Sequence, residues 1–184
     1  MPKDRLALCL GTSVCNEWRS YCSLSASRTM LVCWYAEMLK LAERTLGALG
    51  SRVRLHQGYI DDAPRGPFDG ATCLLTLHFV ALEARRQTVA EVRRRLKPGA
   101  PLIVAHFGFP QGEGERALWL SRYAAFAVAS GMPPEQMANA SAAIAARLTI
   151  LTPEEDEAIL REAGFANISL FYAGFTFRGW VAYA

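Results

Sequence analysis

Short apolar segments recur along the chain and predict the strands of a sheet. Five segments are expected as strands: RLALCL (5–10), RTMLVC (28–33), RVRLHQ (52–57), DGATCLLTL (69–77) and PLIVAHF (101–107). In the third of these, apolar and polar residues alternate, which places Val53 and Leu55 on one face. The fourth is almost continuously apolar, which is typical of a central parallel strand that is covered on both faces.

Between these segments the apolar positions follow a helical period. The helices expected from this pattern cover 36–49, the stretch from Leu82 to Leu96, 115–130, 134–148 and a segment that follows Thr152. Gly50 and Lys97-Pro98-Gly99 are typical stop signals for the first two. Thr152-Pro153-Glu154-Glu155 is a capping box with proline at the first helical position, and Gly164 suits the left-handed residue at the end of that helix.

The segment 166–183 is aromatic and β-branched, and it predicts two strands that form an antiparallel hairpin at a sheet edge. Strand and helix alternate before this hairpin. The sequence therefore predicts an α/β fold, a Rossmann-like doubly wound, mostly parallel sheet with a C-terminal antiparallel hairpin. Residues 1–184 contain no linker or internal repeat, so we expect a single domain, with a helical insertion at about 113–149 that is large enough to form a lid.

Composition narrows the class of protein. Of the 184 residues, 52% are hydrophobic and 20% are charged, a balance typical of a globular chain. No apolar run reaches the roughly 18–20 residues of a membrane span, and the N-terminus lacks a secretory signal, so we expect a cytoplasmic protein with no membrane partner. The five cysteines include no Cys-x-x-Cys pair, so neither a disulfide framework nor a metal site is expected.

The net charge of +3 does not by itself indicate a nucleic-acid partner. The most basic segment, Arg85–Lys97, is interpreted as the solvated face of a helix, with an RNA-facing patch as the alternative. DNA binding is not expected.

Candidate chemistry is sought beyond the carboxyl ends of the strands, because open α/β sheets bind ligands there. The residues at those ends are Gly11-Thr12-Ser13, Cys33-Trp34, Gly58-Tyr59-Ile60-Asp61, Leu74-Leu75-Thr76 and His106-Phe107. The sequence contains no nucleophile elbow, Walker loop or zinc-protease motif. This pattern fits a reaction in which a cofactor carries the activated group and the protein mainly positions two reactants.

From about residue 36 onward the chain resembles the class I S-adenosylmethionine-dependent methyltransferases. The resemblance rests on AEMLKLAERTLGALGSRVRLHQGYIDDAP (36–64), FDGATCLLTLHFV (68–80), VRRRLKPGAPLIVAHF (92–107), LTPEEDEAILREAGF (151–165) and the final hairpin, in this order and spacing. Thr76-Leu77-His78-Phe79 and the closing LFYAGFTFRGWVAYA are most similar to the tRNA wobble-uridine carboxymethoxy methyltransferases and the carboxy-S-adenosylmethionine synthases. The resemblance implies S-adenosylmethionine as the cofactor.

The resemblance also implies roles for single residues. Tyr59 and Ile60, after the third strand, stand where the family holds the adenine, and Leu74 stands where it contacts the methionine part of the cofactor. The glycine-rich loop that lets the backbone approach the cofactor is reduced here to Gly11, followed by Thr12.

Other positions depart from the family or leave alternatives open. Cys33 or Trp34 occupies the place of the acidic residue that accepts hydrogen bonds from the ribose hydroxyls. His106 is a candidate general base near the methyl acceptor, with a packed or solvated histidine as the alternative. Trp119 and Tyr123 are candidate substrate-pocket residues, with packing inside the lid as the alternative.

Two function classes follow. The first is transfer of a methyl group from S-adenosylmethionine to a small molecule or an RNA base, by a protein that could form a homodimer. The alternative is a methyltransferase-like protein that has lost its cofactor and serves as a partner or regulatory subunit. Thr149 stands where the carboxy-cofactor synthases carry an arginine, so a carboxylated cofactor is not expected. A nicotinamide enzyme fits less well, because Gly-x-Gly-x-x-Gly is absent.

Residues 9–34 differ in composition from the family-like sequence on both sides. They hold four of the five cysteines and a single glycine, although the spacing from Gly11 to Ala36 is close to that of the family. We hypothesise that this segment is frame-shifted relative to its relatives or has diverged beyond cofactor binding. Either case predicts weak binding of S-adenosylmethionine or none.

Overall fold

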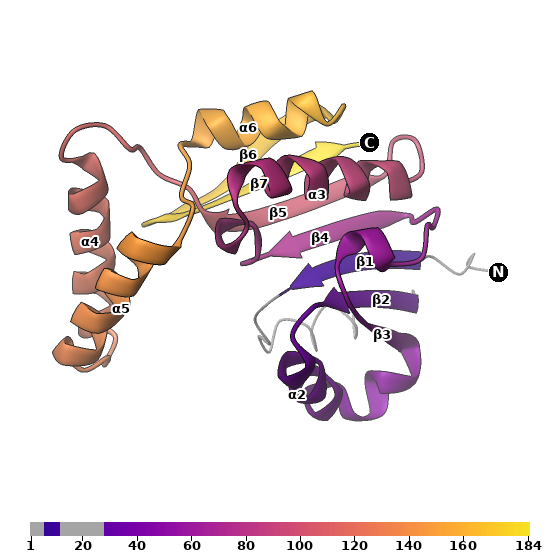
Figure 1. The fold of residues 1–184 in the computed structure, drawn as a ribbon, viewed down its shortest axis with the longest axis horizontal. Coiled ribbons are helices and arrows are strands. Elements are labelled where there is room, and N and C mark those ends of the chain that lie inside the picture. Colours follow the sequence, from indigo (N-terminus) through magenta and orange to yellow (C-terminus); the bar gives the residue numbers. More distant parts are fainter. Residues whose placement is uncertain (1–5, 12–27) are drawn as a thin grey trace.

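A single mixed sheet organises the structure, a computed structural model that describes residues 6–11 and 28–184 (Figure 1). In these ranges the sheet has seven strands, in the order β3-β2-β1-β4-β5-β7-β6. Their bounds are β1 Leu6–Gly11, β2 Arg28–Cys33, β3 Val53–Gln57, β4 Gly70–Leu74, β5 Pro101–Phe107, β6 Ala166–Gly174 and β7 Phe177–Tyr183. Strands β1 to β5 run parallel, whereas β7 is antiparallel to both β5 and β6. The predicted Rossmann-like, doubly wound fold with its antiparallel hairpin is confirmed.

The helices follow the predicted periods, with differences at element ends. Their bounds are α2 Ala36–Leu46, α3 Leu82–Arg95, α4 Glu115–Ala129, α5 Pro134–Arg147 and α6 Pro153–Glu162, with 3-10 helices η1 Gly47–Arg52, η2 Ile60–Asp62 and η3 Leu77–Phe79. The helix expected over 36–49 ends at Leu46, because Gly47 adopts a left-handed φ of 51°. The strand expected over 69–77 ends at Leu74, because Leu75 takes a φ of 54°. Within the described ranges, no helix is both long and apolar enough to cross a membrane.

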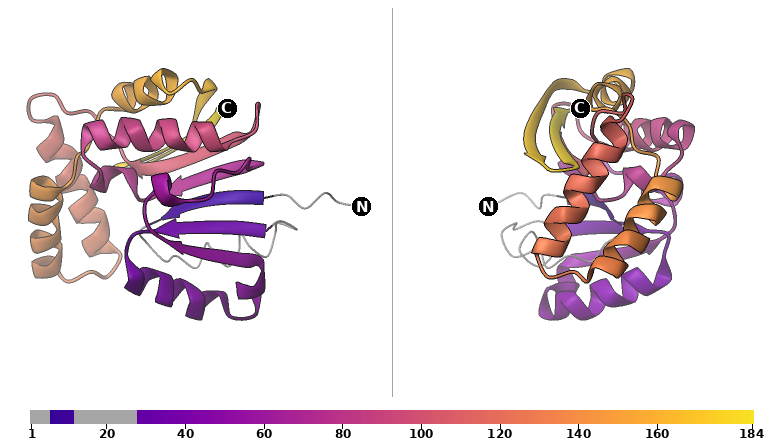
Figure 2. Two further views of the ribbon diagram at one scale, coloured as in Figure 1. Left: turned by 45° about the vertical axis from the view of Figure 1, so that its right-hand side comes forward. Right: turned by 90° about the vertical axis from the view of Figure 1, so that its left-hand side faces the viewer.

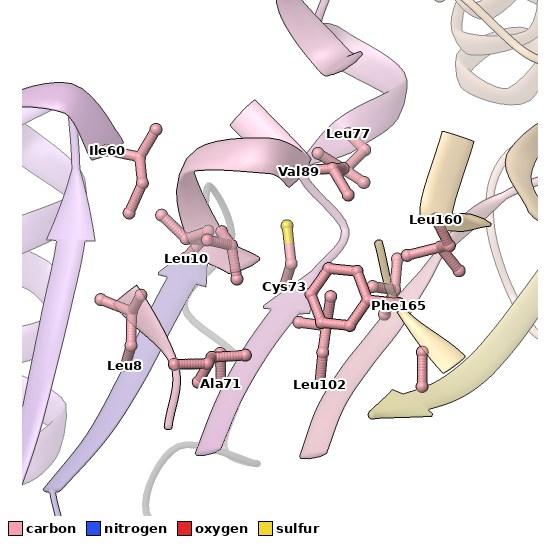
Figure 3. Close-up of a cluster of buried hydrophobic side chains, with 14 of the residues drawn as sticks. Leu8, Leu10, Ile60, Ala71, Cys73, Leu77, Val89, Leu102, Leu160 and Phe165 are labelled. Atoms are coloured by element: carbon pink, nitrogen blue, oxygen red, sulfur yellow. The ribbon is translucent and has the colours of Figure 1, made fainter. Parts of the chain in front are cut away.

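Helices cover both faces of the sheet. Along β2, Met30 and Val32 belong to the cluster that contains α3 and α6, whereas Leu31 and Cys33 pack with α2, as the alternation of a strand requires. The larger cluster fills the space between the sheet and α3, and Figure 3 shows its members from β1, β4 and β5 side by side. Each fully buried leucine or valine there contributes about 1.5–3 kcal/mol to folding.

The helical pair α4–α5 lies outside these layers, beyond one end of the sheet (Figure 1). Figure 2 shows the pair standing in front of the edge toward which the parallel strands point. Its base is an apolar cluster of Phe107, Phe109, Leu120 and Ile150, which joins β5 to α4 and to the segment before α6. The pair therefore lies beyond the carboxyl ends of the parallel strands, and its role as a lid stays a prediction.

The basic segment Arg85–Lys97 forms most of α3, and its side chains are largely paired. Arg86 Nε lies 3.2 Å from Glu162 Oε2 on α6. The expectation of one solvated helix face needs correction at Arg85 and Arg95, which are both buried. A buried guanidinium must keep hydrogen-bond partners inside the protein, so these two side chains serve the fold rather than an RNA-facing surface.

Candidate functional site

A cavity of about 400 Å³ opens at the carboxyl edge of the sheet, where β1, β2 and β3 end. It lies beside β1, the strand at which the order of the sheet reverses toward β4. Open α/β sheets bind their ligands at such a switch point. The lining residues are Leu10, Val32, Cys33, Trp34, Gly58, Tyr59, Ile60, Asp61, Thr76, Phe79, Val80, Ala81, Ala84, Gln87 and Thr88.

The loop after β3 forms one wall of the cavity, and short-range contacts fix it. The N–H of Gly58 donates to the carbonyl of Cys33 at 3.2 Å, which ties the end of β3 to the end of β2. A side chain at position 58 would be crowded, because a Cβ there would lie 3.0 Å from His56 Nε2. The N–H of Tyr59 donates to Asp62 Oδ2 at 3.5 Å, at the start of η2. These contacts hold the backbone that carries the Tyr59 ring.

Aromatic side chains surround the mouth of the cavity. The ring centroids of Trp34 and Tyr59 lie 5.6 Å apart, with the planes tilted by 49°. Tyr59 is 61% exposed, Phe79 51% and Trp34 38%, although all three line the cavity. Exposed aromatic rings that gather at a concave apolar site suit a flat ring system that can stack on them.

The start of α3 forms a second wall. Ala81, Ala84 and Thr88 recur at helical spacing on the side of α3 that lines the cavity, with Gln87 beside them. Small side chains at these positions leave the space that the cavity occupies. The hydroxyl of Thr76 donates to the carbonyl of the residue two positions before it at 2.9 Å, which fixes the turn that leads into this wall.

The structure brings some of the predicted cofactor residues together and separates others. Tyr59 and Ile60 both line the cavity. Gly11 ends β1 and lies in register with Leu74 on the neighbouring strand. Among the residues that the structure describes, Leu74 is not part of the lining, because its position alternates with the β4 residues that face α3. Thr12 lies outside the described residues.

His106 lies in the interior and not at the cavity. Its side chain is 1% exposed, and its Nε2 atom lies 3.0 Å from Asp156 Oδ2 on α6. The imidazole ring also contacts Trp180, with 5.5 Å between ring centroids. A methyl acceptor in the cavity would not reach this nitrogen, so the arrangement favours the packed alternative.

Trp119 and Tyr123 pack at the base of the helical pair. Tyr123 meets the ring of Phe107 edge-on, with 5.5 Å between centroids. The guanidinium of Arg178 lies 5.2 Å from the ring centroid of Trp119, a cation–π contact between β7 and α4. Both candidate substrate residues are partly buried in this cluster, which favours packing between α4 and the sheet.

The end of β2 carries Cys33 and Trp34 at the place where the family has an acid. Both residues line the cavity, and their correspondence to the acidic position of the family stays a prediction. Of the described residues that line the cavity, Asp61 is the one with a carboxylate, and its side chain is exposed.

Sequence reasoning missed the wall formed by α3. Ala84, Gln87 and Thr88 lie outside the strand ends, where ligand contacts were sought. A signal was present, because the small residues 81, 84 and 88 form a stripe next to the apolar stripe of Val89 and Val92. Small residues at helical spacing indicate a place where another group comes close to the helix.

Comparison with known proteins identifies the family of the chain. A family model described as a methyltransferase domain matches residues 8–99, half of the chain. This range includes most of β1, all of β2 to β4 and the residues that line the cavity. The chain belongs to the methyltransferase domain family. The resemblance to class I S-adenosylmethionine-dependent methyltransferases is thereby confirmed, whereas the branch within the class has weaker support.

This methyltransferase-domain chain is similar in sequence to a curated enzyme and in fold to several solved structures. It is 26% identical over 148 residues to a carboxy-S-adenosyl-L-methionine synthase from Chromohalobacter salexigens, a match that covers 79% of the chain and 55% of that protein. An O-methyltransferase family protein from Burkholderia thailandensis has the same fold, with a TM-score of 0.69, 15% identity and coverage of 98% of the chain and 51% of that protein. The chain thus spans about half the length of these relatives.

A third similar structure is phosphoethanolamine N-methyltransferase 2 from Haemonchus contortus in complex with S-adenosyl-L-methionine. Its TM-score is 0.70 at 12% identity, and the match covers 100% of the chain and 49% of that protein. At these identities the likeness to the solved structures concerns the fold.

Proposed function

We propose that the chain transfers a methyl group from S-adenosylmethionine, which binds in the cavity at the ends of β1, β2 and β3. The observation that carries the proposal is the aromatic cavity at the switch point of a chain that belongs to the methyltransferase domain family. S-adenosylmethionine supplies an activated methyl group when bound, so the protein has to bind and orient two reactants.

The residues at the cavity fit the base of a nucleoside. Trp34, Tyr59 and Ile60 offer apolar and aromatic surface for a purine ring. Gly11, at the end of β1, offers a backbone without a side chain next to Leu74. The cavity fits the ribose of the nucleoside less well. The two ribose hydroxyls need hydrogen-bond acceptors, whereas the end of β2 supplies the thiol of Cys33 and the indole of Trp34.

We assign the acceptor site to the space between the cavity and the helical pair α4–α5, which acts as a lid within a single domain of residues 1–184. The pair stands across the carboxyl edge of the sheet and packs on it through an aromatic base (Figure 2). A small-molecule acceptor fits this enclosed geometry better than an RNA base, because the basic side chains of the segment Arg85–Lys97 largely pair with acids of the same chain. Acceptor identity depends on the shape of the space below the lid.

The cofactor is assigned as S-adenosylmethionine and not its carboxylated form. At position 149, where a carboxylate-binding arginine would stand, the chain has a threonine, and the backbone of this residue is bonded to the protein interior.

A methyltransferase-like partner protein without cofactor is the second candidate function. The observation in its favour is the end of β2, where Cys33 and Trp34 give the ribose no carboxylate.

Titration calorimetry with S-adenosylmethionine and S-adenosylhomocysteine separates the two candidates. The first predicts saturable binding of both compounds, and it predicts that Tyr59→Ala weakens binding about tenfold, since a lost stacking contact is worth about 1 kcal/mol or more. Tyr172→Ala, at an exposed tyrosine on the far edge strand, is the matched control and should bind like the wild type. If neither compound binds to the wild-type chain, the methyl-transfer function is contradicted and the partner-protein function is favoured.

A further inference from the structure

A buried ion pair lies directly behind the cavity wall. Arg85 on α3 and Asp156 on α6 are both almost completely shielded from solvent, and Arg85 Nη1 lies 3.0 Å from Asp156 Oδ1. Asp156 Oδ2 lies 3.0 Å from His106 Nε2, so the carboxylate also meets β5. A guanidinium in such a place is stable only while its partners stay in position.

The same guanidinium holds the segment that leaves the helical pair. Arg85 Nη2 donates to the carbonyl of Thr149, the second residue after α5. The N–H of Thr149 donates to the carbonyl of His78 at 3.0 Å. Both backbone groups of residue 149 are therefore held by one short piece of chain, the turn from η3 into α3.

The other side of this turn is the cavity wall. Phe79, Val80, Ala81 and Ala84 line the cavity, and Arg85 follows Ala84 on the same helical turn. A ligand that packs on these residues limits the movement of the turn. Because the turn holds Thr149 at two backbone atoms, restricting it also restricts the end of α5.

We infer that Arg85 is a positioning residue that couples the cavity to the helical pair α4–α5, so that a ligand in the cavity orders the pair through Thr149. This inference rests on the proposed function, because the ligand is the nucleoside part of S-adenosylmethionine or its product. A lysine cannot replace the arginine in this role, since one ammonium group does not span Asp156 and the Thr149 carbonyl as the two arms of a guanidinium do.

Amide hydrogen exchange, followed by mass spectrometry with and without S-adenosylhomocysteine, tests the coupling. In the wild type, the ligand is expected to slow exchange at residues 58–62, the segment whose first four residues line the cavity. It is also expected to slow exchange at 144–151, by about fivefold or more. In Arg85→Gln and Arg85→Lys the slowing at 58–62 should remain, whereas that at 144–151 should fall below about twofold. Arg86→Gln is the matched control, because Arg86 is the next residue on α3 and its ion pairs are on the surface.

The outcomes separate the coupling from the proposed function. If S-adenosylhomocysteine does not change the exchange rate at 58–62 in the wild type, the proposed function is overturned. Slowing at 58–62 without slowing at 144–151 in the wild type would overturn the coupling alone, whether or not the Arg85 variants fold. Slowing at 144–151 that persists in a folded Arg85→Lys protein would assign the coupling to other contacts, whereas a merely structural role of Arg85 would change basal exchange and leave the ligand effect intact.

Discussion

At the scale of single residues, His78 shows how burial changes the chemistry of a side chain. Its ring is almost completely buried, and its Nδ1 atom accepts a hydrogen bond from the N–H of Phe107 at 3.4 Å. Burial, followed by the charges of His106 and Arg85, lowers the pKa of His78 to about 3. The folded protein therefore keeps this imidazole neutral over the whole physiological range of pH.

The lowered pKa of His78 predicts a loss of stability on acidification. Below pH 6.5 the unfolded chain binds this proton, whereas the folded chain binds it only near pH 3, so falling pH in this window favours unfolding. The group should lower the free energy of unfolding by about 1.4 kcal/mol per pH unit across the window. Urea unfolding at a series of pH values should show a shallower slope for His78→Asn, whose amide oxygen can still accept the bond from Phe107. Parallel pH profiles for the two proteins would contradict this prediction.

The residue scale also shows where sequence reasoning stops. Tyr59 was located at the cavity because it follows a strand, and the position of a strand end can be recognised from an apolar run. His106 was also chosen as a candidate because it lies near the end of a strand, yet its side chain points into the interior between β5 and α6. Which face a residue at a strand end takes depends on the helices that pack there, and the sequence of the strand alone does not contain that information.

At the scale of elements, α6 is defined by local sequence signals. The hydroxyl of Thr152 accepts a hydrogen bond from the N–H of Glu155, whose carboxylate accepts one from the N–H of Thr152. At the other end, Gly164 has a φ of 89°. Both ends were predicted, because capping depends on residues three or four positions apart and not on the rest of the fold.

Removal of the N-terminal cap of α6 should destabilise the protein. Thr152→Ala removes the acceptor for the N–H of Glu155 and is expected to cost about 1 kcal/mol in the free energy of unfolding. Thr45→Ala is the control, because the hydroxyl of Thr45 bonds to a helix carbonyl within α2 and its loss should change stability by less than about 0.5 kcal/mol. Chemical denaturation measures both; equal effects of the two substitutions would show that the cap contributes nothing of its own.

Element ends that depend on tertiary contacts were predicted less well. The apolar run 69–77 continues past the end of β4, because Leu77, the first residue of η3, is buried in the core without extending the strand. The N–H of Leu75 donates to the carbonyl of Ala105, so the neighbouring strand β5 determines where β4 ends. Long apolar segments indicate burial but do not distinguish a strand from the turn after it.

At the scale of the whole molecule, the order of elements was enough to predict the fold class and the edge of the sheet that carries the cavity. The α3 wall was not predicted, since it depends on how α3 lies across the sheet. The hypothesis about residues 9–34 concerns mainly a segment outside the described residues, apart from β1 and β2. β2 is buried from its second residue onward and pairs with strands on both sides, as its apolar pattern predicts.

The edge strand β6 has an uncharged surface, which predicts that copies of this chain associate with one another. Residues 166–177 carry no charge, and on β6 the side chains of Leu170, Phe171 and Tyr172 are exposed, with Phe171 at 58%. Sheet edges that lack charged residues or proline tend to pair with other chains. In sedimentation velocity, the average sedimentation coefficient of the wild type should rise with protein concentration. Phe171→Lys should lower it toward the value of the monomer. A wild-type chain that remains monomeric over the full concentration range would contradict this expectation.

The place of β7 in the sheet has a consequence for synthesis on the ribosome. β5 is translated about seventy residues before β7, yet β7 is the strand that pairs with it along its full length and brings the fully buried Trp180 into the core. Until β7 has emerged, the growing chain presents an open strand edge and an unfilled place for an indole ring. Pairing between segments so distant in sequence is slow, so the unpaired edge of β5 stays exposed for longer during synthesis than it would in a fold with local pairing.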